Sequence, residues 1–296
     1  MYVNRMRSIL LGVFVITTNA VETMAQGRVL RNHTMLETVP LSLVPATKQL
    51  AKGRVTIKFS GRYRLITSNG IPTHRVGIFP NAGNPNRIKP QSYAFSVAYI
   101  PRPASRPQAL SMENLMGVAV NGVPFDPLAA EYYEGQRNGW QYDALGGGVP
   151  LGLDANYAHV QPNGAYHYHG LPVGLMQQLG WRATRPSPLI GYAADGFPIF
   201  AITVNIDGKV QKMRSSYRLK SGQRPGGRNP SGEYDGTFIN DYKYVEGAGH
   251  LDKCNGTKVT TKDYPNGVYA YFLTEEFPVV PRCLIGKIGK GFKKKR

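Results

Sequence analysis

Three of the six histidines in the chain lie within eleven residues of one another, and this cluster is the pattern best suited to chemistry. His167 and His169 belong to the tetrapeptide Tyr166-His167-Tyr168-His169, which we interpret as part of a strand. Successive side chains of a strand point to opposite faces, so the two histidines share one face and the tyrosines share the other. Positions i and i+2 lie about 6.6 Å apart along a strand, a gap that two imidazoles can span to hold one cation.

His159 lies upstream of this pair, across the Pro162-Asn163-Gly164 turn. If this turn folds back, a third imidazole nitrogen joins the first two. Three imidazoles with an open fourth position suit Zn²⁺ or Cu²⁺, and the absence of Met and Cys beside the histidines disfavours Cu⁺. The cluster therefore predicts one copper or zinc ion bound by His159, His167 and His169, with aromatic packing and the binding of an anion or a sugar as alternatives.

Two further residues are candidates for the same site. His74 lies in a loop dense in Gly, Pro and Asn, where function is often found, and we expect it to be either a fourth metal ligand or an ordinary surface histidine. Asp195 directly precedes Gly196 and is expected to end a strand close to the site. There it would serve as a base, a ligand or a partner of a ligating histidine, unless it is a simple turn residue.

An internal repeat connects residues 153–170 with residues 251–273. Both segments begin with Leu-Asp and later reach Pro-Asn-Gly followed by Tyr-x-Tyr. Each is followed by a similar hexapeptide, PSPLIG in the first copy and PRCLIG in the second, so the repeated units span residues 153–191 and 251–286. We therefore expect two related structural units that pack against each other in one domain.

The repeat separates the residues that build the fold from those that could do chemistry. Four tyrosines occupy matching positions in the two copies and are expected to be structural: Tyr166, Tyr168, Tyr269 and Tyr271. The histidines between and after the first pair are matched by Ala270 and Phe272, and no histidine lies opposite His159. Because the second copy lacks all three imidazoles, the fold does not require them, and they become candidates for function.

The composition favours many short strands joined by turns, since the chain has 34 Gly, 22 Pro and only 18% charged residues. We predict a mainly β fold, or an α+β fold with a few short helices, in which internally duplicated strand-turn units pack into one domain. Asn121-Gly122 and Asp207-Gly208 are typical of β-hairpin turns. Short helices are expected over residues 127–133 and 173–179, the second ended by Gly180.

The N-terminus predicts export. Residues 1–25 contain two arginines, an apolar run over residues 9–16 and then small residues, which is typical of a secretory signal peptide; a retained anchor is the alternative. The apolar run is far shorter than the roughly 20 residues that a membrane-spanning helix needs. We expect a periplasmic or secreted protein without a transmembrane segment in its mature chain. Residues 26–50 are interpreted as a loose lead-in, residues 51–287 as the domain, and residues 288–296 as a flexible basic tail.

Cys254 and Cys283 are the only cysteines, and in an oxidising compartment they are expected to form a disulfide; two free buried thiols are the alternative. The net charge of +18 predicts attraction to anionic surfaces. An envelope surface or a polysaccharide would be bound through the basic tail. Nucleic acid is not an expected partner, because the chain is exported and has no recognition-helix or RNA-binding strand motif.

Five stretches of the chain resemble the YHYH domain family, which is named for the tetrapeptide of the histidine strand. They are SNGIPTHRVGIFPNAGNP, NGVPFDPLAAEYY, LDANYAHVQPNGAYHYHG, PLIGYAADGFPIF and YVEGAGHLDKCNGTKVTTKDYPNGVYAYFLTEEFPVVPRCLIG. The resemblance covers roughly residues 55–287 and implies an exported bacterial protein, without implying an activity. Family members usually carry a cysteine and Gly-His where this chain has Ala155-Asn156-Tyr157-Ala158-His159, so the histidine is kept while the cysteine and the glycine are not.

Three functional hypotheses follow from these residues. The first is an exported copper- or zinc-binding protein that uses the histidine cluster. The second is an enzyme at the same site, either a hydrolase with a metal-activated water and Asp195 as base, or a copper oxidoreductase with Tyr166 or Tyr168 nearby. The third is a non-catalytic envelope module that binds an anionic polymer. Simple metal binding is preferred, because no HExxH, GxSxG or other complete catalytic signature occurs.

Overall fold

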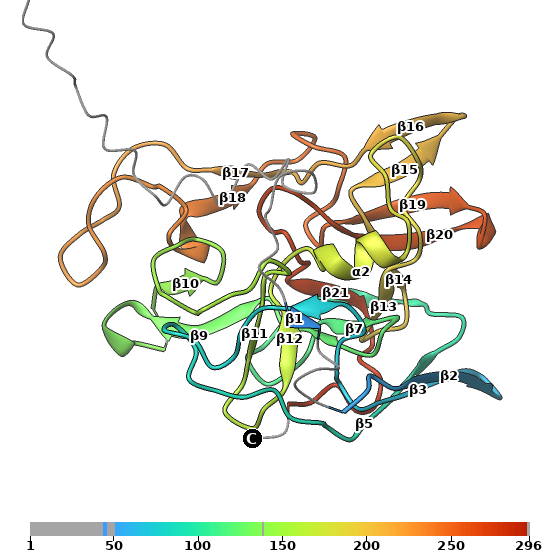
Figure 1. Ribbon diagram of the computed structural model, residues 1–296. Helices are drawn as coiled ribbons and strands as arrows, with labels where there is room; N and C mark the ends of the chain where they lie inside the picture. The colour runs from blue at the N-terminus through green and yellow to red at the C-terminus, as the bar shows by residue number, and fades with distance from the viewer. Residues whose placement is uncertain (1–43, 46–50, 138, 295–296) are drawn as a thin grey trace, which may run out of the picture.

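Strands make up most of the regular structure, so the predicted mainly β fold is confirmed (Figure 1). The structure is a computed structural model that describes residues 44–45, 51–137 and 139–294. The predicted signal peptide and almost all of the predicted lead-in lie outside the described residues.

The elements are short and numerous, as a chain rich in glycine and proline predicts. The strands are β1 (Val44–Pro45), β2 (Val55–Ser60), β3 (Tyr63–Ser68), β4 (Arg75–Val76), β5 (Tyr93–Ala98), β6 (Pro103–Ala109), β7 (Gly117–Ala119), β8 (Pro124–Phe125), β9 (Leu128–Tyr132), β10 (Gln141–Asp143), β11 (Ala158–Val160), β12 (Tyr166–Tyr168), β13 (Gly191–Ala193), β14 (Pro198–Ala201), β15 (Thr203–Ile206), β16 (Lys209–Lys212), β17 (Tyr217–Leu219), β18 (Tyr242–Tyr244), β19 (Gly256–Thr261), β20 (Tyr264–Leu273) and β21 (Cys283–Gly286). The helices are α2 (Val173–Gln178) and the 3-10 turns η2 (Tyr133–Gly135) and η3 (Ile239–Asp241).

Most of the local predictions agree with these elements. Asn121-Gly122 joins the antiparallel strands β7 and β8, and Asp207-Gly208 joins β15 and β16, so both hairpins are confirmed. The helix expected over residues 173–179 is α2. The helix expected over residues 127–133 is wrong, because this segment forms β9 and pairs with β10. Pairing with a distant strand overrides the helical preference of the two alanines in β9.

The largest sheet has eight strands in the order β11-β12-β8-β7-β13-β14-β20-β19, and it is built from two four-stranded halves. In each half an antiparallel hairpin, β7–β8 or β13–β14, lies beside a second antiparallel pair, β11–β12 or β19–β20. The inner strand of that pair runs parallel to the hairpin: β12 along β8, and β20 along β14. The two halves meet where β7 pairs antiparallel with β13.

The loop before the outer strand has the same hydrogen bonds in both halves. The amide of Asp154 donates to the carbonyl of Ala158 over 2.9 Å, and the amide of Asp252 donates to the carbonyl of Gly256 over 2.9 Å. Inside each loop, one residue that is not glycine has a positive φ, 51° in the first half and 59° in the second. A tyrosine hydroxyl closes each loop by donating to its aspartate.

The hairpins are repeated as well, which the sequence interpretation did not include. The segments GVAVNGVPF and GYAADGFPIF, at residues 117–125 and 191–200, share glycine, alanine, the Asn/Asp-Gly turn and proline. The PSPLIG and PRCLIG segments are not equivalent in space, because the first leads into β13 at the centre of the large sheet and the second lies in β21, which pairs with β6. The repeated structural unit therefore begins with a hairpin, β7–β8 or β13–β14, rather than ending with these hexapeptides.

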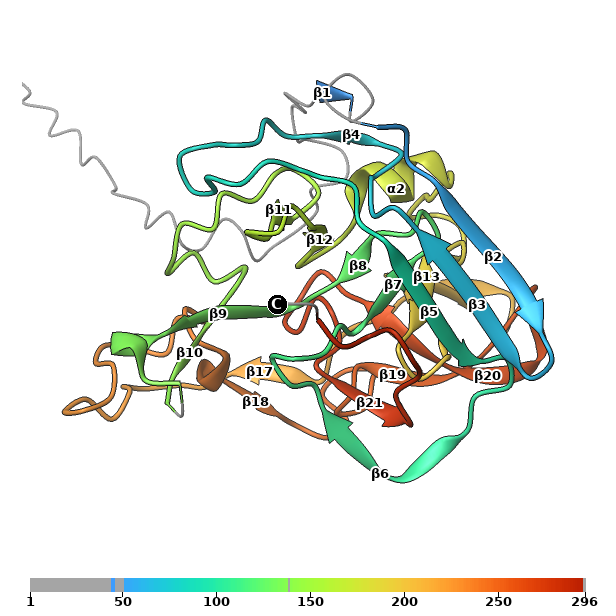
Figure 2. The same cartoon turned by 90° about the horizontal axis from the view of Figure 1, so that it is seen from below.

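A second sheet, β2-β3-β5, contributes to the same apolar core (Figure 2). Ile66 and Phe95 from this sheet are at most 2% exposed, and they belong to one cluster with Tyr168 and Tyr271 of the large sheet. Tyr166 is also fully buried, as a structural role requires. Burial of whole tyrosine rings stabilises the fold only because each hydroxyl finds a hydrogen-bond partner.

The segment after residue 287 is packed against the fold as far as residue 294, so the expected flexible tail is not what the structure shows. The ring of Phe292 is fully buried and stacks on Phe95 with 4.6 Å between ring centroids. Lys290 exchanges backbone hydrogen bonds with Ser96. Lys294 forms an ion pair with the buried carboxylate of Asp126. One apolar ring and one paired ammonium therefore hold a segment whose charge alone suggested a solvated tail.

The predicted disulfide between Cys254 and Cys283 is present, and it connects the loop before β19 to β21. Within the described part of the chain, no helix is long and apolar enough to cross a membrane.

We predict that Cys254→Ser/Cys283→Ser lowers the free energy of unfolding by about 3–4 kcal/mol, because the disulfide restricts the unfolded chain. Urea unfolding followed by circular dichroism measures the change. A reducing agent should shift the wild-type midpoint by the same amount and leave that of the double variant unchanged. An equal effect of the reducing agent on both proteins would contradict the prediction.

Candidate metal centre

The histidines lie on β11 and β12, which form a hairpin at the edge of the large sheet. The turn folds back as predicted, since the amide of Gly164 donates to the carbonyl of Gln161 over 2.8 Å. Gly164 has φ of 89°, and a Cβ there would lie 2.5 Å from the side chain of Lys89, so the turn requires glycine. The antiparallel register places His159 directly opposite His167, and His169 follows at the end of β12.

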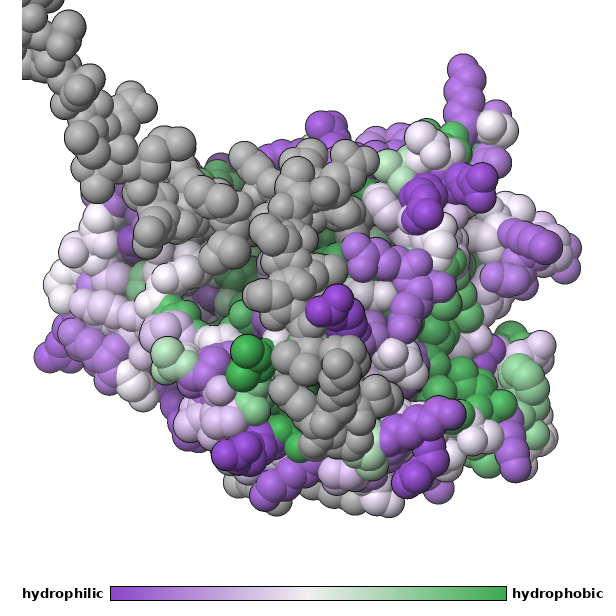
Figure 3. All heavy atoms as spheres, viewed as in Figure 1, coloured by the Kyte–Doolittle hydropathy of each residue, from purple (hydrophilic) through white to green (hydrophobic). Residues whose placement is uncertain are grey.

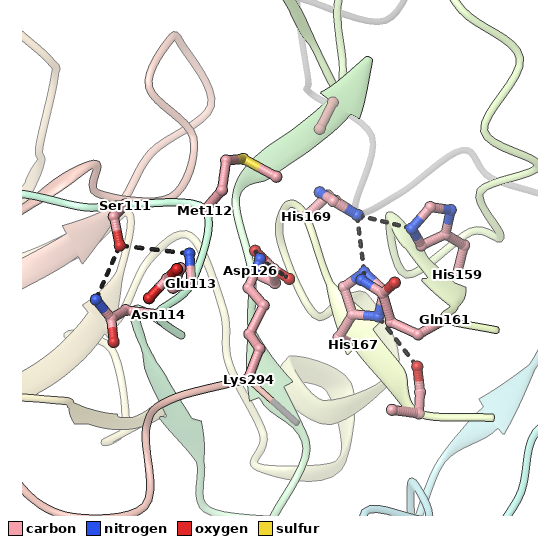
Figure 4. Close-up of polar contacts among 12 residues, drawn as sticks. Ser111, Met112, Glu113, Asn114, Asp126, His159, Gln161, His167, His169 and Lys294 are labelled. Atoms are coloured by element: carbon pink, nitrogen blue, oxygen red, sulfur yellow. Dashed lines mark hydrogen bonds and ion pairs between the residues drawn. The ribbon is translucent and has the colours of Figure 1, made fainter. Parts of the chain in front are cut away.

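The three imidazoles surround one point (Figure 4). Their ring centroids are 4.6, 4.6 and 4.7 Å apart, and the ring planes are inclined to one another by 65–81°. The Nε2 atom of His169 lies 3.0 Å from Nε2 of His167 and 3.0 Å from Nε2 of His159. The sequence prediction that these three side chains converge is confirmed.

The other ring nitrogens define which atoms carry lone pairs. Nδ1 of His159 lies 2.9 Å from the carbonyl of Leu151, and Nδ1 of His167 lies 3.1 Å from the carbonyl of Ala165. A carbonyl only accepts, so both Nδ1 atoms carry protons and both Nε2 atoms carry lone pairs. Nε2 of His169 has one proton at most and can donate it to only one of these neighbours. At least one of the two close contacts therefore sets lone pair against lone pair, an arrangement that a cation held between the nitrogens would relieve.

Burial keeps these imidazoles neutral. His167 and His169 are 2% and 3% exposed, and His159 is partly buried. Desolvation lowers the pKa of His159 and lowers the pKa of the other two well below the usual histidine value. A proton on one imidazole would repel a proton on the next, which lowers the pKa of His167 and His169 further. Neutral imidazole is the form that binds metals, so the local environment favours ligation over protonation.

His74 is not brought to this cluster. Its Nε2 atom lies 2.5 Å from the hydroxyl of Tyr168, and its Nδ1 atom lies 2.8 Å from the carbonyl of Arg75. Tyr168 points to the opposite face of β12 from the histidines, so His74 packs on the tyrosine face. Both of its ring nitrogens are engaged there, and the structure offers it as a partner of Tyr168 rather than as a fourth ligand.

Asp195 also lies away from the three histidines, in the turn of the β13–β14 hairpin. Its Oδ2 atom accepts hydrogen bonds from the hydroxyl of Tyr271 over 2.7 Å and from the amide of Gly286 over 2.8 Å. Asn121 holds the equivalent position in the first half and donates to the hydroxyl of Tyr168 over 2.9 Å. Asp195 therefore binds a structural tyrosine of the second half.

The sequence interpretation missed three neighbours of the cluster. The side-chain nitrogen Nε2 of Gln161 lies 3.5 Å from Nε2 of His167. Gln161 follows His159 by two residues, and this strand spacing indicates that both side chains lie on the same face. Asp126, 1% exposed, and Lys294 form an ion pair that Figure 4 shows beside the histidines. No local pattern places Lys294 there, because it comes from the far end of the chain.

In the second half of the sheet, the equivalent hairpin β19–β20 has the same strand pairing but no histidine at the three equivalent positions. Thr257 pairs with Ala270 as His159 pairs with His167, and Phe272 occupies the place of His169. Ala270 and Phe272 belong to a small apolar cluster. An open surface depression of about 400 Å³ lies beside this hairpin, lined by residues that include Tyr244, His250, Lys258 and Tyr269 and by none of the three clustered histidines.

Comparison with known proteins assigns a family and nothing beyond it. A family model described as YHYH protein matches residues 94–286. No curated protein and no solved structure matches the chain.

Asp195→Asn tests how the buried carboxylate affects stability. Asparagine is expected to fit this turn, because Asn121 holds the equivalent position in the first half. Burial raises the pKa of Asp195 above that of the unfolded chain, although its hydrogen bonds oppose the shift. Its stabilising contribution is therefore present below the unfolded-state pKa and is lost as the pH rises through the folded-state pKa. We expect the stability of the wild type relative to the variant to fall as the pH rises from about 4 towards neutrality.

Urea unfolding at a series of pH values measures this difference. Glu113→Gln, at an exposed position, serves as the control and should show little dependence of this kind. If the wild type instead became more stable than Asp195→Asn as the pH rises, the raised pKa of Asp195 would be contradicted.

Proposed function

The chain belongs to the YHYH family, and we propose that it binds one transition-metal ion through His159, His167 and His169. The observation that carries the proposal is the close approach of the three Nε2 atoms. Nε2 of His169 lies 3.0 Å from Nε2 of His167 and 3.0 Å from Nε2 of His159. Carbonyl groups hold the Nδ1 protons of two of these rings, and this arrangement orients the Nε2 lone pairs inward.

The spacing of the nitrogens supports ligation. Three nitrogens bound tetrahedrally at about 2.0–2.1 Å from a metal lie roughly 3.3 Å apart, close to the 3.0 Å contacts of the triad. The two contacts of His169 would lengthen by only a few tenths of an ångström to admit the ion. The β11–β12 register holds two of the ligands in place before the metal arrives. Gln161, beside His167, is positioned to contact a ligand in the fourth coordination position.

Copper and zinc are the metals we propose. Neutral imidazole nitrogens suit both, and the affinity of nitrogen ligands for divalent first-row metals is highest for Cu²⁺. The cluster contains no thiolate, which would favour softer ions. An exported location is part of the proposal, and the disulfide between Cys254 and Cys283 supports it, since such bonds persist in oxidising compartments.

Binding is favoured over catalysis by the surroundings of the triad. Two of the three imidazoles are almost fully buried, so a substrate would have little access to a bound ion. Asp195, the base considered for a metal-dependent hydrolase, is hydrogen-bonded to Tyr271 in the other half of the sheet. Retention on an anionic polymer through a flexible basic tail is also less favoured, because the burial of Phe292 and the ion pair of Lys294 with Asp126 hold this segment against the fold.

Metal content tests the proposal directly. We expect near-stoichiometric copper or zinc in protein purified from its producing cells and almost none in His167→Ala/His169→Ala, as measured by elemental mass spectrometry. His250→Ala removes an exposed histidine outside the triad and should retain the metal. Circular dichroism should show that all three proteins are folded. A folded wild type that takes up no copper or zinc under oxidising or reducing conditions would refute the proposal.

Metal binding should also stabilise the native state. At a free metal concentration of one hundred times Kd, the free energy of unfolding is expected to rise by about 2.7 kcal/mol. Thermal unfolding with and without metal, and after treatment with a chelator, measures this change. The wild type and His250→Ala should respond alike, and His167→Ala/His169→Ala should not respond. An equal shift in all three would place the metal elsewhere.

A further inference from the structure

Residues 51–112 carry an unusual charge. This stretch contains ten basic residues and no acidic residue; the ten are Lys52, Arg54, Lys58, Arg62, Arg64, Arg75, Arg87, Lys89, Arg102 and Arg106. It supplies all of the sheet β2-β3-β5, as well as β4 and β6. The charged side chains of the sheet β2-β3-β5 are therefore all positive. Such a surface is expected to be attracted to anionic surfaces.

Large apolar side chains project from one end of this layer. We define the aromatic rim as Phe59, Tyr63, Tyr99 and Ile100, which are 63%, 50%, 49% and 75% exposed. Phe59 and Tyr63 flank the β2–β3 turn, and Tyr99 and Ile100 follow β5. The ring centroids of Phe59 and Tyr99 are 4.9 Å apart, so the two chain segments meet at the rim. Figure 2 shows the ends of these strands together, and Figure 3 shows hydrophobic and hydrophilic residues side by side over this part of the molecule.

Arg64 lies beneath the rim and adds a positive charge that forms no ion pair within the described residues. It is 3% exposed, and its guanidinium lies 3.7 Å from the ring centroid of Tyr192 and 5.6 and 5.3 Å from those of Phe59 and Tyr99. Among the described residues no carboxylate forms an ion pair with Arg64, and its Nε and Nη1 atoms have no hydrogen-bond partner. The rings offset part of the cost of this buried cation.

Exposed basic side chains surround the rim. Lys58 precedes Phe59, Arg62 precedes Tyr63, and Arg102 follows Ile100 by two residues, all at exposed positions. We propose that the aromatic rim docks on an anionic lipid bilayer, with the four apolar side chains in the interface and the basic residues on lipid phosphates. Aromatic rings with a polar group favour the interfacial region, and an aliphatic and aromatic tip flanked by Lys and Arg is the arrangement that peripheral membrane binding requires.

A soluble anionic polymer fits the rim less well. The basic residues alone could attract a polymer, but Phe59 and Ile100 offer such a chain no hydrogen bonds and project outward instead of lining a groove. A bilayer uses both features at once, because it takes up the apolar tips and attracts the charges.

Cosedimentation with vesicles tests the proposal. Vesicles of phosphatidylcholine and phosphatidylglycerol in equal parts should bind the wild type, whereas phosphatidylcholine vesicles should bind it at least tenfold less. Phe59→Ser/Ile100→Ser should lower the partition coefficient on the anionic vesicles by about tenfold or more. Ile78→Ser/Val210→Ser is the matched control, because it removes two exposed apolar side chains, 61% and 38% exposed, outside the rim.

Charge reversal gives an independent readout. Lys58→Glu/Arg62→Glu should also weaken binding by about tenfold, and the effect should shrink as added salt screens the charges. All variants carry the same N-terminus and should show wild-type circular dichroism and metal content. Equal vesicle binding by the rim variant and its control would overturn the proposal. So would binding to dextran sulfate that matches binding to vesicles and survives Phe59→Ser/Ile100→Ser, since that result identifies a polymer site.

Discussion

The hydroxyl of Tyr168 is the polar group on which the histidine strand depends. The ring is fully buried, and burial of an unpaired hydroxyl would cancel much of the free energy that burial of the ring contributes. Asn121 donates to this hydroxyl, and His74 lies 2.5 Å from it, so the hydroxyl is satisfied from two separate segments. These contacts hold the tyrosine face of β12 inward. Because faces alternate along a strand, they also hold His167 and His169 on the other side.

The triad could be predicted from sequence because it depends on local spacing. A strand period of two and one turn place all three histidines, and their absence from the second copy marks them as additions to the scaffold. The position of His74 could not be predicted in this way, because it depends on which face of β12 receives a loop more than ninety residues away in sequence. The same holds for Lys294, whose partner Asp126 follows a strand of the central sheet.

Other differences arise where pairing with a distant segment overrides local preference. Residues 127–133 have the composition of a short helix, but β9 is held by its pairing with β10. The C-terminal segment is strongly basic, yet the burial of Phe292 decides its position. The duplicated hairpin was readable, since glycine, alanine, the Asn/Asp-Gly turn and proline recur in the same order in both copies. The shared residues are small and common in turns, so this repeat is a weaker signal than the match between PSPLIG and PRCLIG.

The junction between β7 and β13 has a consequence for the origin of the fold. Gly117 pairs with Ala193, the counterpart of Ala119, and Ala119 pairs with Gly191, the counterpart of Gly117, so the two pairs are equivalent. Such reciprocal pairing defines the isologous interface of a two-fold symmetric dimer. Two copies of a four-stranded protein joined edge to edge would present the same contact, and gene duplication with fusion would preserve it within one polypeptide. By this reasoning the ancestor was a self-associating half, and fusion freed one copy to gain or keep histidines while the other maintained the sheet.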